Sequence, residues 1–207
     1  MKPDVVLTPC KDYSQGEVES ALVRVLEPLG GLSWVKPGMR IAIKANLVTF
    51  LKPERAATTH PSLLCALVRM LTERGADVVV GDSPGGLYNA AYVKRVYQAT
   101  GMEQVEQAGG RLNWDFSHAQ GEYPEGKVCR QFTYTAYLSK ADAIINFCKL
   151  KTHGMMAMTC GAKNMFGSIP GAMKPEYHFR FPDPRDFARM IVDLDEYFKP
   201  RLTIVDA

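Results

Sequence analysis

The chain has 207 residues, of which 46% are hydrophobic and 23% charged, and a formal net charge of +3 at pH 7. These values are typical of a globular protein with one substantial core. The charged start, with Lys2 and Asp4, fits neither a signal peptide nor a membrane span, so we predict a cytoplasmic protein with no membrane partner.

The first part of the chain alternates candidate strands and helices. An apolar repeat at helical spacing predicts a helix over 18–29, which Gly30 and Gly31 end. A second helix is expected after the N-cap region 58–61, where proline lies in the first turn. Apolar runs predict strands at 4–8, 39–48 and 76–82.

The second part continues the alternation after a less regular middle. The segment 88–108 has a helical pattern with a break near Gly101, and 111–115 and 127–134 are candidate strands. We therefore expect a small inserted lobe around 101–135. A strand at 141–151, a helix at 187–198 and a final strand at 201–207 complete the pattern.

This order predicts an α/β fold in layers, with a mainly parallel sheet flanked by helices. We expect residues 1–207 to form a single α/β domain. Because a covering helix normally follows a strand in such folds, we expect the natural protein to continue after Ala207.

Four of the predicted strands end in polar residues. In open parallel sheets, ligands bind beyond the carboxyl ends of the strands. The residues at or just after these ends are Lys44, Asn46, Asp82, Ser83, Lys149, Lys151 and Asp206. We expect them to meet at one edge of the sheet.

The stretch DSPGG (82–86) follows a strand and precedes a helical segment, but it matches no nucleotide-binding fingerprint. Two interpretations remain open. In the first, the backbone amides of this stretch hold an anion. In the second, the stretch is a turn that Asp82 caps. A further alternative is a magnesium ion shared by Asp82 and Asp206.

Positive charge gathers late in the chain. Between Lys149 and Arg180 there are five Lys and Arg residues and one acid, Glu176. In an extended strand, Lys149, Lys151 and His153 project to the same side, where they repel one another unless an anion lies between them. One local patch fits a small anionic ligand better than nucleic acid, which would meet a wider basic surface. The alternative is a solvated strand end.

The following segment adds donors. A short helix is expected at 162–167, where Lys163 and Asn164 offer charge-assisted and neutral hydrogen bonds. Lys174 and His178 lie four residues apart and join this candidate site, and His60 reaches it from its helix entry unless its role is structural. The methionines of this segment also allow a copper site, although packing explains them without a metal.

The five cysteines form no C-x-x-C pair and are widely spaced. This pattern argues against a disulfide framework and against a zinc or iron–sulfur site within this chain. We predict no metal site.

Six motifs in order resemble the domain of unknown function 362 family: IKANLV (43–48), TTHPSLL (58–64), GDSPGG (81–86), INFCKLKTH (145–153), GAKNMFG (161–167) and KPEYH (174–178). The resemblance implies a protein from bacteria or archaea, whose relatives are commonly longer and often carry a ferredoxin-like segment that binds 4Fe-4S clusters. No such segment occurs in this chain, and the cofactor stays unknown. All twelve residues that we predict for the site lie within these motifs, whereas Asp206 lies outside them.

We therefore predict an uncharacterised enzyme domain that binds a small phosphate- or carboxylate-bearing ligand at the sheet edge, with a redox link through the family. His153, His178 and Asp82 are the expected catalytic residues. The expected ligand-binding residues are Lys44, Asn46, His60, Ser83, Lys149, Lys151, Lys163, Asn164 and Lys174. The alternative is a non-catalytic module that docks or scaffolds a ferredoxin-like protein.

Overall fold

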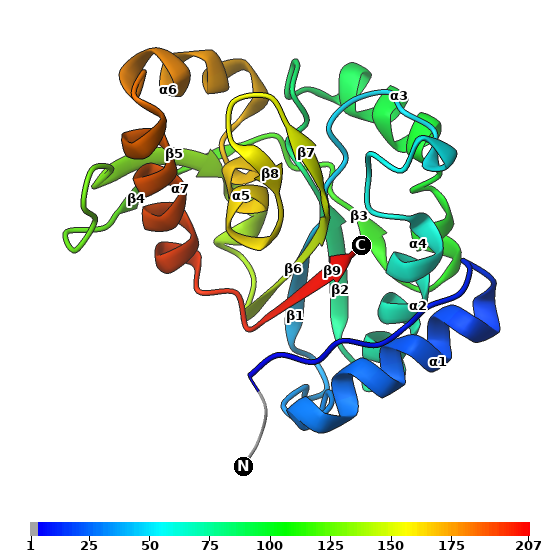
Figure 1. The fold of residues 1–207 in the computed structure, drawn as a ribbon. Coiled ribbons are helices and arrows are strands. Elements are labelled where there is room, and N and C mark those ends of the chain that lie inside the picture. Colours follow the sequence, from blue (N-terminus) through cyan, green and yellow to red (C-terminus); the bar gives the residue numbers. More distant parts are fainter. Residues whose placement is uncertain (1–3) are drawn as a thin grey trace.

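The computed structural model describes residues 4–207. Five strands form one sheet in which every neighbouring pair is parallel. In spatial order they are β3 (Arg111–Leu112), β2 (Asp77–Gly81), β1 (Arg40–Lys44), β6 (Ala143–Lys149) and β9 (Leu202–Asp206) (Figure 1). The predicted α/β fold, with a parallel sheet flanked by helices, is confirmed.

The strand order reverses between β1 and β6. The chain passes from β1 to β2 and β3 on one side, and it places β6 and β9 on the other. Connections therefore leave the carboxyl ends of β1 and β6 in opposite directions, which is where parallel sheets bind ligands. The register pairs Lys44 with Asn146 and Lys149 with Asp206 at this end.

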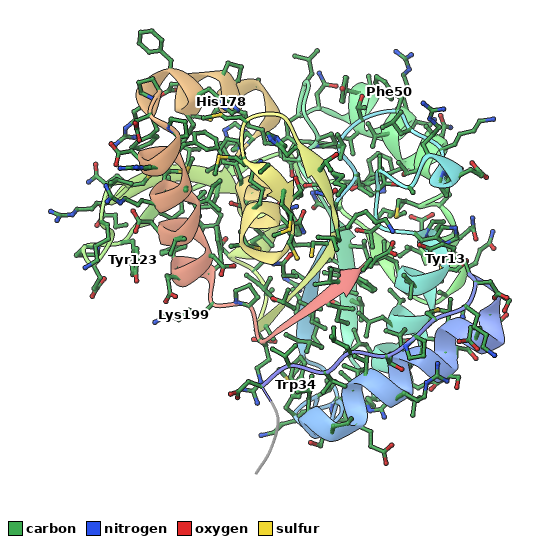
Figure 2. All side chains as sticks on the ribbon, in the orientation of Figure 1. Tyr13, Trp34, Phe50, Tyr123, His178 and Lys199 are labelled. Atoms are coloured by element: carbon green, nitrogen blue, oxygen red, sulfur yellow. The ribbon has the colours of Figure 1, made fainter. Side chains whose placement is uncertain are left out.

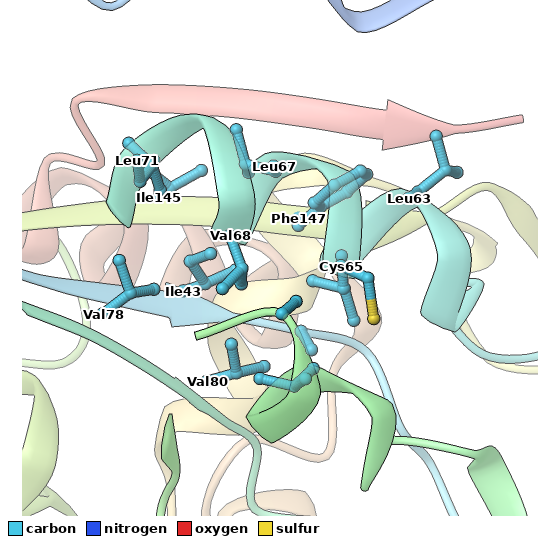
Figure 3. Close-up of a cluster of buried hydrophobic side chains, with 14 of the residues drawn as sticks. Ile43, Leu63, Cys65, Leu67, Val68, Leu71, Val78, Val80, Ile145 and Phe147 are labelled. Atoms are coloured by element: carbon cyan, nitrogen blue, oxygen red, sulfur yellow. The ribbon is translucent and has the colours of Figure 1, made fainter. Parts of the chain in front are cut away.

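Four helices belong to the core on the first face of the sheet. They are α1 (Gln15–Leu26), α2 (Pro61–Thr72), α3 (Ala90–Thr100) and α4 (Gln104–Gln107). Figure 3 shows the stripe of α2, with Leu67 and Leu71, packed on Ile43, Ile145 and Phe147 of the strands. Side chains alternate along a strand, so these apolar residues face the helices and their neighbours face the opposite side.

The opposite face is covered by α5 (Gly161–Met165), α6 (Lys174–Arg180) and α7 (Pro184–Phe198), which Figure 1 shows on the other side of the sheet from α1 and α2. Phe166, Phe187 and Met190 are central to this second core. Two antiparallel hairpins pair β4 (His118–Glu122) with β5 (Gln131–Thr135), and β7 (Lys151–His153) with β8 (Ala157–Thr159). Short 3-10 turns lie at Glu27–Leu29, Pro53–Arg55, Ala136–Leu138, Phe166–Ser168 and Gly171–Met173.

Two expectations need correction. The segment 4–8 is not a strand, because no other segment within residues 4–207 pairs with it, and its Val5 and Leu7 are 76% and 93% exposed. The inserted lobe is smaller than predicted, since within 101–135 only β4 and β5 form a separate sheet, whereas β3 pairs with β2 in the main sheet.

Within residues 4–207, no helix is both long enough and apolar enough to cross a lipid bilayer.

Candidate functional site

A buried ion pair lies at the carboxyl end of β1. The Lys44 Nζ lies 2.6 Å from the Asp82 Oδ1 and donates to the Ala45 carbonyl at 2.7 Å. The Asp82 Oδ2 accepts the Leu47 amide at 2.8 Å. One oxygen of Asp82 faces a lysine and the other accepts an amide, so its carboxylate connects Lys44 to the backbone that follows β1.

The backbone at residue 167 packs directly against this pair. A Cβ atom on Gly167 would lie 2.6 Å from the Asp82 Oδ1 and in contact with the Lys44 ammonium. The Ser83 amide also donates to the Gly167 carbonyl at 3.2 Å. A glycine is therefore required here by the close approach of two charged side chains.

Three asparagines form a chain of hydrogen bonds beside the ion pair. Asn164, on α5, donates to the Asn146 Oδ1 at 2.8 Å and accepts from the Asn46 Nδ2 at 2.7 Å. Asn146 in turn donates to the Gly161 carbonyl at 2.9 Å. Sequence reasoning missed Asn146, although a polar residue inside the apolar run of β6 was a usable signal.

Lys151 lies at the start of the β7–β8 hairpin and contacts only neutral acceptors. Its Nζ donates to the Asn46 Oδ1 and, at 2.6 Å, to the Ala57 carbonyl. Burial lowers the pKa of Lys151 to about 8, and although Asp82 opposes this shift, Lys44 and Lys163 add to it. Lys151 is therefore crowded by positive charge that no paired acid cancels.

Lys174, the first residue of α6, has a similar environment. Its Nζ donates to the carbonyl oxygens of Ser83 and, at 3.1 Å, Pro84. Burial lowers the pKa of Lys174 to about 7, with Lys44 and Lys163 adding to the shift and Asp82 opposing it. The Ser83 hydroxyl accepts the Gly171 amide at 2.7 Å and so fixes the loop over Lys174.

Lys163 makes no hydrogen bond to another described residue, and its Nζ lies 5.1 Å from the centre of the Phe166 ring. Burial and the charge of Lys44 lower its pKa. Within the described part of the chain, Lys151, Lys163 and Lys174 all lack an ion-pair partner. We call these three residues the unpaired lysines.

Lys149 belongs to a separate cluster. Its Nζ lies 2.8 Å from the Asp206 Oδ1 and 3.3 Å from the Tyr13 hydroxyl, which also donates to Asp206 at 2.8 Å. Burial opposes the charge on Lys149, but Asp206 raises the pKa of its ammonium above the usual value. The His60 amide donates to the Asp206 Oδ2 at 3.0 Å, and the His60 ring stacks on Tyr13 with centroids 3.7 Å apart.

The predicted row of Lys149, Lys151 and His153 is therefore wrong. Leu150 interrupts the strand, so Lys149 ends β6 in one cluster while Lys151 starts β7 in another. Acids from outside the basic stretch supply partners, because Asp82 pairs with Lys44 and Asp206 with Lys149. Asp82 follows β2 and Asp206 ends β9, and β1 and β6 lie between these strands, so the two aspartates are too far apart to share one magnesium ion.

The histidines differ in their positions. The Nδ1 atoms of His60 and His153 accept backbone amides, at 3.3 and 3.2 Å, so each neutral ring carries its hydrogen on Nε2. His178 lies on α6 (Figure 2) and stacks on Phe187 with centroids 4.5 Å apart. Burial is the main cause that lowers the pKa of all three, and Lys163 adds to the effect at His153 and His178.

Tyr13 is a further site residue that sequence reasoning did not find. It lies in the extended segment before α1 (Figure 2), far from the motifs in the sequence, and no local pattern marks it. Two surface hollows lie elsewhere, and none of the unpaired lysines lines either of them. One, of about 590 Å³, is lined by Lys127, Arg130 and Arg180, and the other, of about 440 Å³, by Trp34 and Phe198.

The fold and the polar edge define a class of α/β domains in which lysines and asparagines gather at the strand ends. The model of the domain of unknown function 362 matches residues 41–207, so the chain belongs to that family. This result confirms the resemblance carried by the six motifs.

Two known proteins are similar to the chain. The thylakoid-associated protein sll1697 of Synechocystis is 34% identical over 221 residues, which cover 100% of this chain and 63% of that protein. The lactate racemase apoprotein of Thermoanaerobacterium thermosaccharolyticum has the same fold, with a TM-score of 0.59 and 14% identity, over 92% of this chain and 49% of its own. The chain thus spans less than two thirds of the length of the first protein and about half of the length of the second.

Proposed function

We propose that the carboxyl edge of the sheet binds a small carboxylate- or phosphate-bearing ligand and transfers a proton to or from it. The observation that carries this proposal is the set of unpaired lysines. Three partly buried ammonium groups without carboxylate partners repel one another, and an anion among them offsets that repulsion.

We assign separate roles in ligand binding to the residues of the site. Lys151 and Lys163 hold the anion, because each charge-assisted hydrogen bond to an anion is stronger than a neutral one. The buried Lys44–Asp82 pair forms the inner side of the site. The hydrogen-bonded asparagines hold α5 in place beside that pair. Lys149 is already neutralised by Asp206, so it is not expected to contact the ligand.

Proton transfer is assigned to Lys174, with His153 and His178 as relays. A group transfers protons best when its pKa lies near the working pH. The pKa of Lys174 is lowered to about 7, so its amine exists in both states near neutrality. The solved neighbour is a racemase of lactate, a small carboxylate, which is compatible with this ligand class.

Sulfate binding followed by calorimetry tests the proposal, because sulfate does not titrate between pH 6 and 9. Replacing Lys151 or Lys163 by Met removes one charge-assisted contact, which is worth about 1.5–3 kcal/mol or roughly ten- to hundredfold in affinity. The matched control is Lys94→Met, an exposed lysine on α3. The two site variants should weaken sulfate binding and the control should not.

Sulfate affinity that is equal in all four proteins would contradict the proposal. The docking alternative predicts a different result, namely no sulfate site but binding to an acidic ferredoxin that weakens steeply as salt rises. The half-buried state of the unpaired lysines favours the small ligand over a flat docking surface. The cytoplasmic location and the redox link stay predictions.

A further inference from the structure

The amine of Lys174 has an unusual set of partners. Its two acceptors are the backbone carbonyl oxygens of Ser83 and Pro84, and it has no ion-pair partner among residues 4–207. A neutral amine has two N–H bonds and one lone pair. Two carbonyl oxygens take both hydrogens and leave the lone pair free, which is the arrangement that a nucleophilic lysine needs.

Burial of Lys174 favours the same neutral state. Lys44 and Lys163 add to this effect, and Asp82 opposes it. The same cations attract a carboxylate. By contrast, the Lys44 ammonium lies 2.6 Å from the Asp82 carboxylate. Lys174 therefore differs from Lys44 in its partners, which are backbone carbonyls and not a carboxylate.

We propose that Lys174 is a nucleophile that forms an imine with a small 2-oxo carboxylate. The proposal deepens the proposed function and rests on it for the binding of the carboxylate, which Lys151 and Lys163 hold. It adds a covalent step and a substrate class, because only a ligand with a carbonyl group reacts with an amine in this way.

The step balances without an oxidant or a reductant. The nitrogen lone pair of Lys174 attacks the carbonyl carbon, a C–N bond forms, and the C=O double bond becomes a C–O single bond. The oxygen leaves as water with the two hydrogens of the amine, and the new C=N bond takes up a proton. The protonated imine then draws electrons from the neighbouring carbon, whose proton is removed more easily.

A histidine that can relay protons lies one helical turn from Lys174. Residues four apart lie on the same face of a helix, so His178 follows Lys174 on α6. Its ring is stacked on Phe187 and lies 5.7 Å from the centre of the Phe166 ring, beside Lys163. Burial and Lys163 lower the pKa of His178, which favours its neutral ring, and this ring relays protons between the site and the solvent.

Reductive trapping tests the proposal directly. The full chain is incubated with pyruvate and sodium cyanoborohydride at pH 7, and the modified lysine is located by peptide mass mapping. Lys174 should be labelled at least about tenfold faster than the exposed Lys94, because a far larger share of its amine is neutral. Lys174→Arg should abolish this adduct, whereas Lys94→Arg should leave it unchanged. Sulfate should slow the labelling.

Labelling of Lys174 that is no faster than that of Lys94 would overturn the proposal. If Lys174→Arg does not fold, as judged by circular dichroism, the mapping of the unsubstituted chain decides alone. The two proposals fail separately. Sulfate binding without a Lys174 adduct leaves the anion site standing and removes the imine, whereas a fast adduct without sulfate binding supports the nucleophile and removes the anion site.

Discussion

The Lys44 ammonium lies 2.6 Å from the Asp82 carboxylate at a position where Lys44 is 0% and Asp82 3% exposed. The contact follows from strand pairing, because β1 and β2 are neighbours in register and Lys44 pairs with Gly81, the residue before Asp82. The pair is a fixed charged centre, and all three unpaired lysines respond to the charge of Lys44.

Breaking this pair should be costly. Asp82→Asn leaves the Lys44 charge buried without its partner, and we expect the free energy of unfolding to fall by about 3–5 kcal/mol in urea denaturation. The exposed pair of Arg189 and Asp186 provides the control, since Arg189→Met should cost less than about 1 kcal/mol. Similar small losses in both variants would show that Lys44 and Asp82 are not a tightly coupled pair.

Gly167→Ala should disturb the site through close packing alone. The added methyl group meets the Asp82 Oδ1 at 2.6 Å, so one of the charged side chains must move. We expect a loss of about 1–3 kcal/mol in stability together with weaker sulfate binding. Gly154→Ala is the matched change on the nearby hairpin, where nothing lies within 4 Å, and it should be nearly neutral. If both variants bind sulfate as the unsubstituted chain does, the tight packing at Gly167 has no role in the site.

The pH dependence of stability and of anion binding should run in opposite directions. Lys151 and Lys174 have a pKa of about 8 and about 7 in the folded chain, below the ordinary value of a lysine. The unfolded state therefore binds more protons between pH 7 and 9, and these two lysines make stability rise with pH. Sulfate affinity should fall over the same range as the ammonium groups lose charge. Melting curves and calorimetry at several pH values check both trends, and a sulfate affinity that rises between pH 7 and 9 would refute the assignment.

Tyr13 should control the protonation of His60. The groups that face the His60 ring or act on its charge are Tyr13, Asp206, Lys149 and Glu54, and burial is the main cause of its lowered pKa. Tyr13→Leu removes the stacked ring, so the pKa of His60 should rise toward the ordinary value. Tyr13→Phe keeps the ring and should leave that pKa low while removing the hydrogen bond to Asp206.

Proton NMR titration of the four histidines measures this effect, with His60 assigned through His60→Gln. The same His60 titration curve in the Tyr13→Leu variant and the unsubstituted chain would mean that the N-terminal segment does not shield the ring.

Much of the fold could be predicted from the sequence because its signals are local. The helical repeats that became α1, α2 and α7 and the apolar runs that became β2 and β6 need only their own residues to be recognised. The segment 4–8 has the same composition as a strand, but a strand also requires a partner, and its own sequence says nothing about one. The prediction failed there for that reason.

The residues that arrive at the carboxyl edge can be read from the sequence, since the period of a strand and the rule for parallel sheets place Lys44, Asp82 and Lys151 there. The pairing of their charges depends on the folded chain. Asp206 lies 57 residues from its partner Lys149, and Tyr13 lies 136 residues from the same lysine. Because electrostatic energy depends on distance in space, the division into paired anchors and unpaired lysines appears only when the chain is folded.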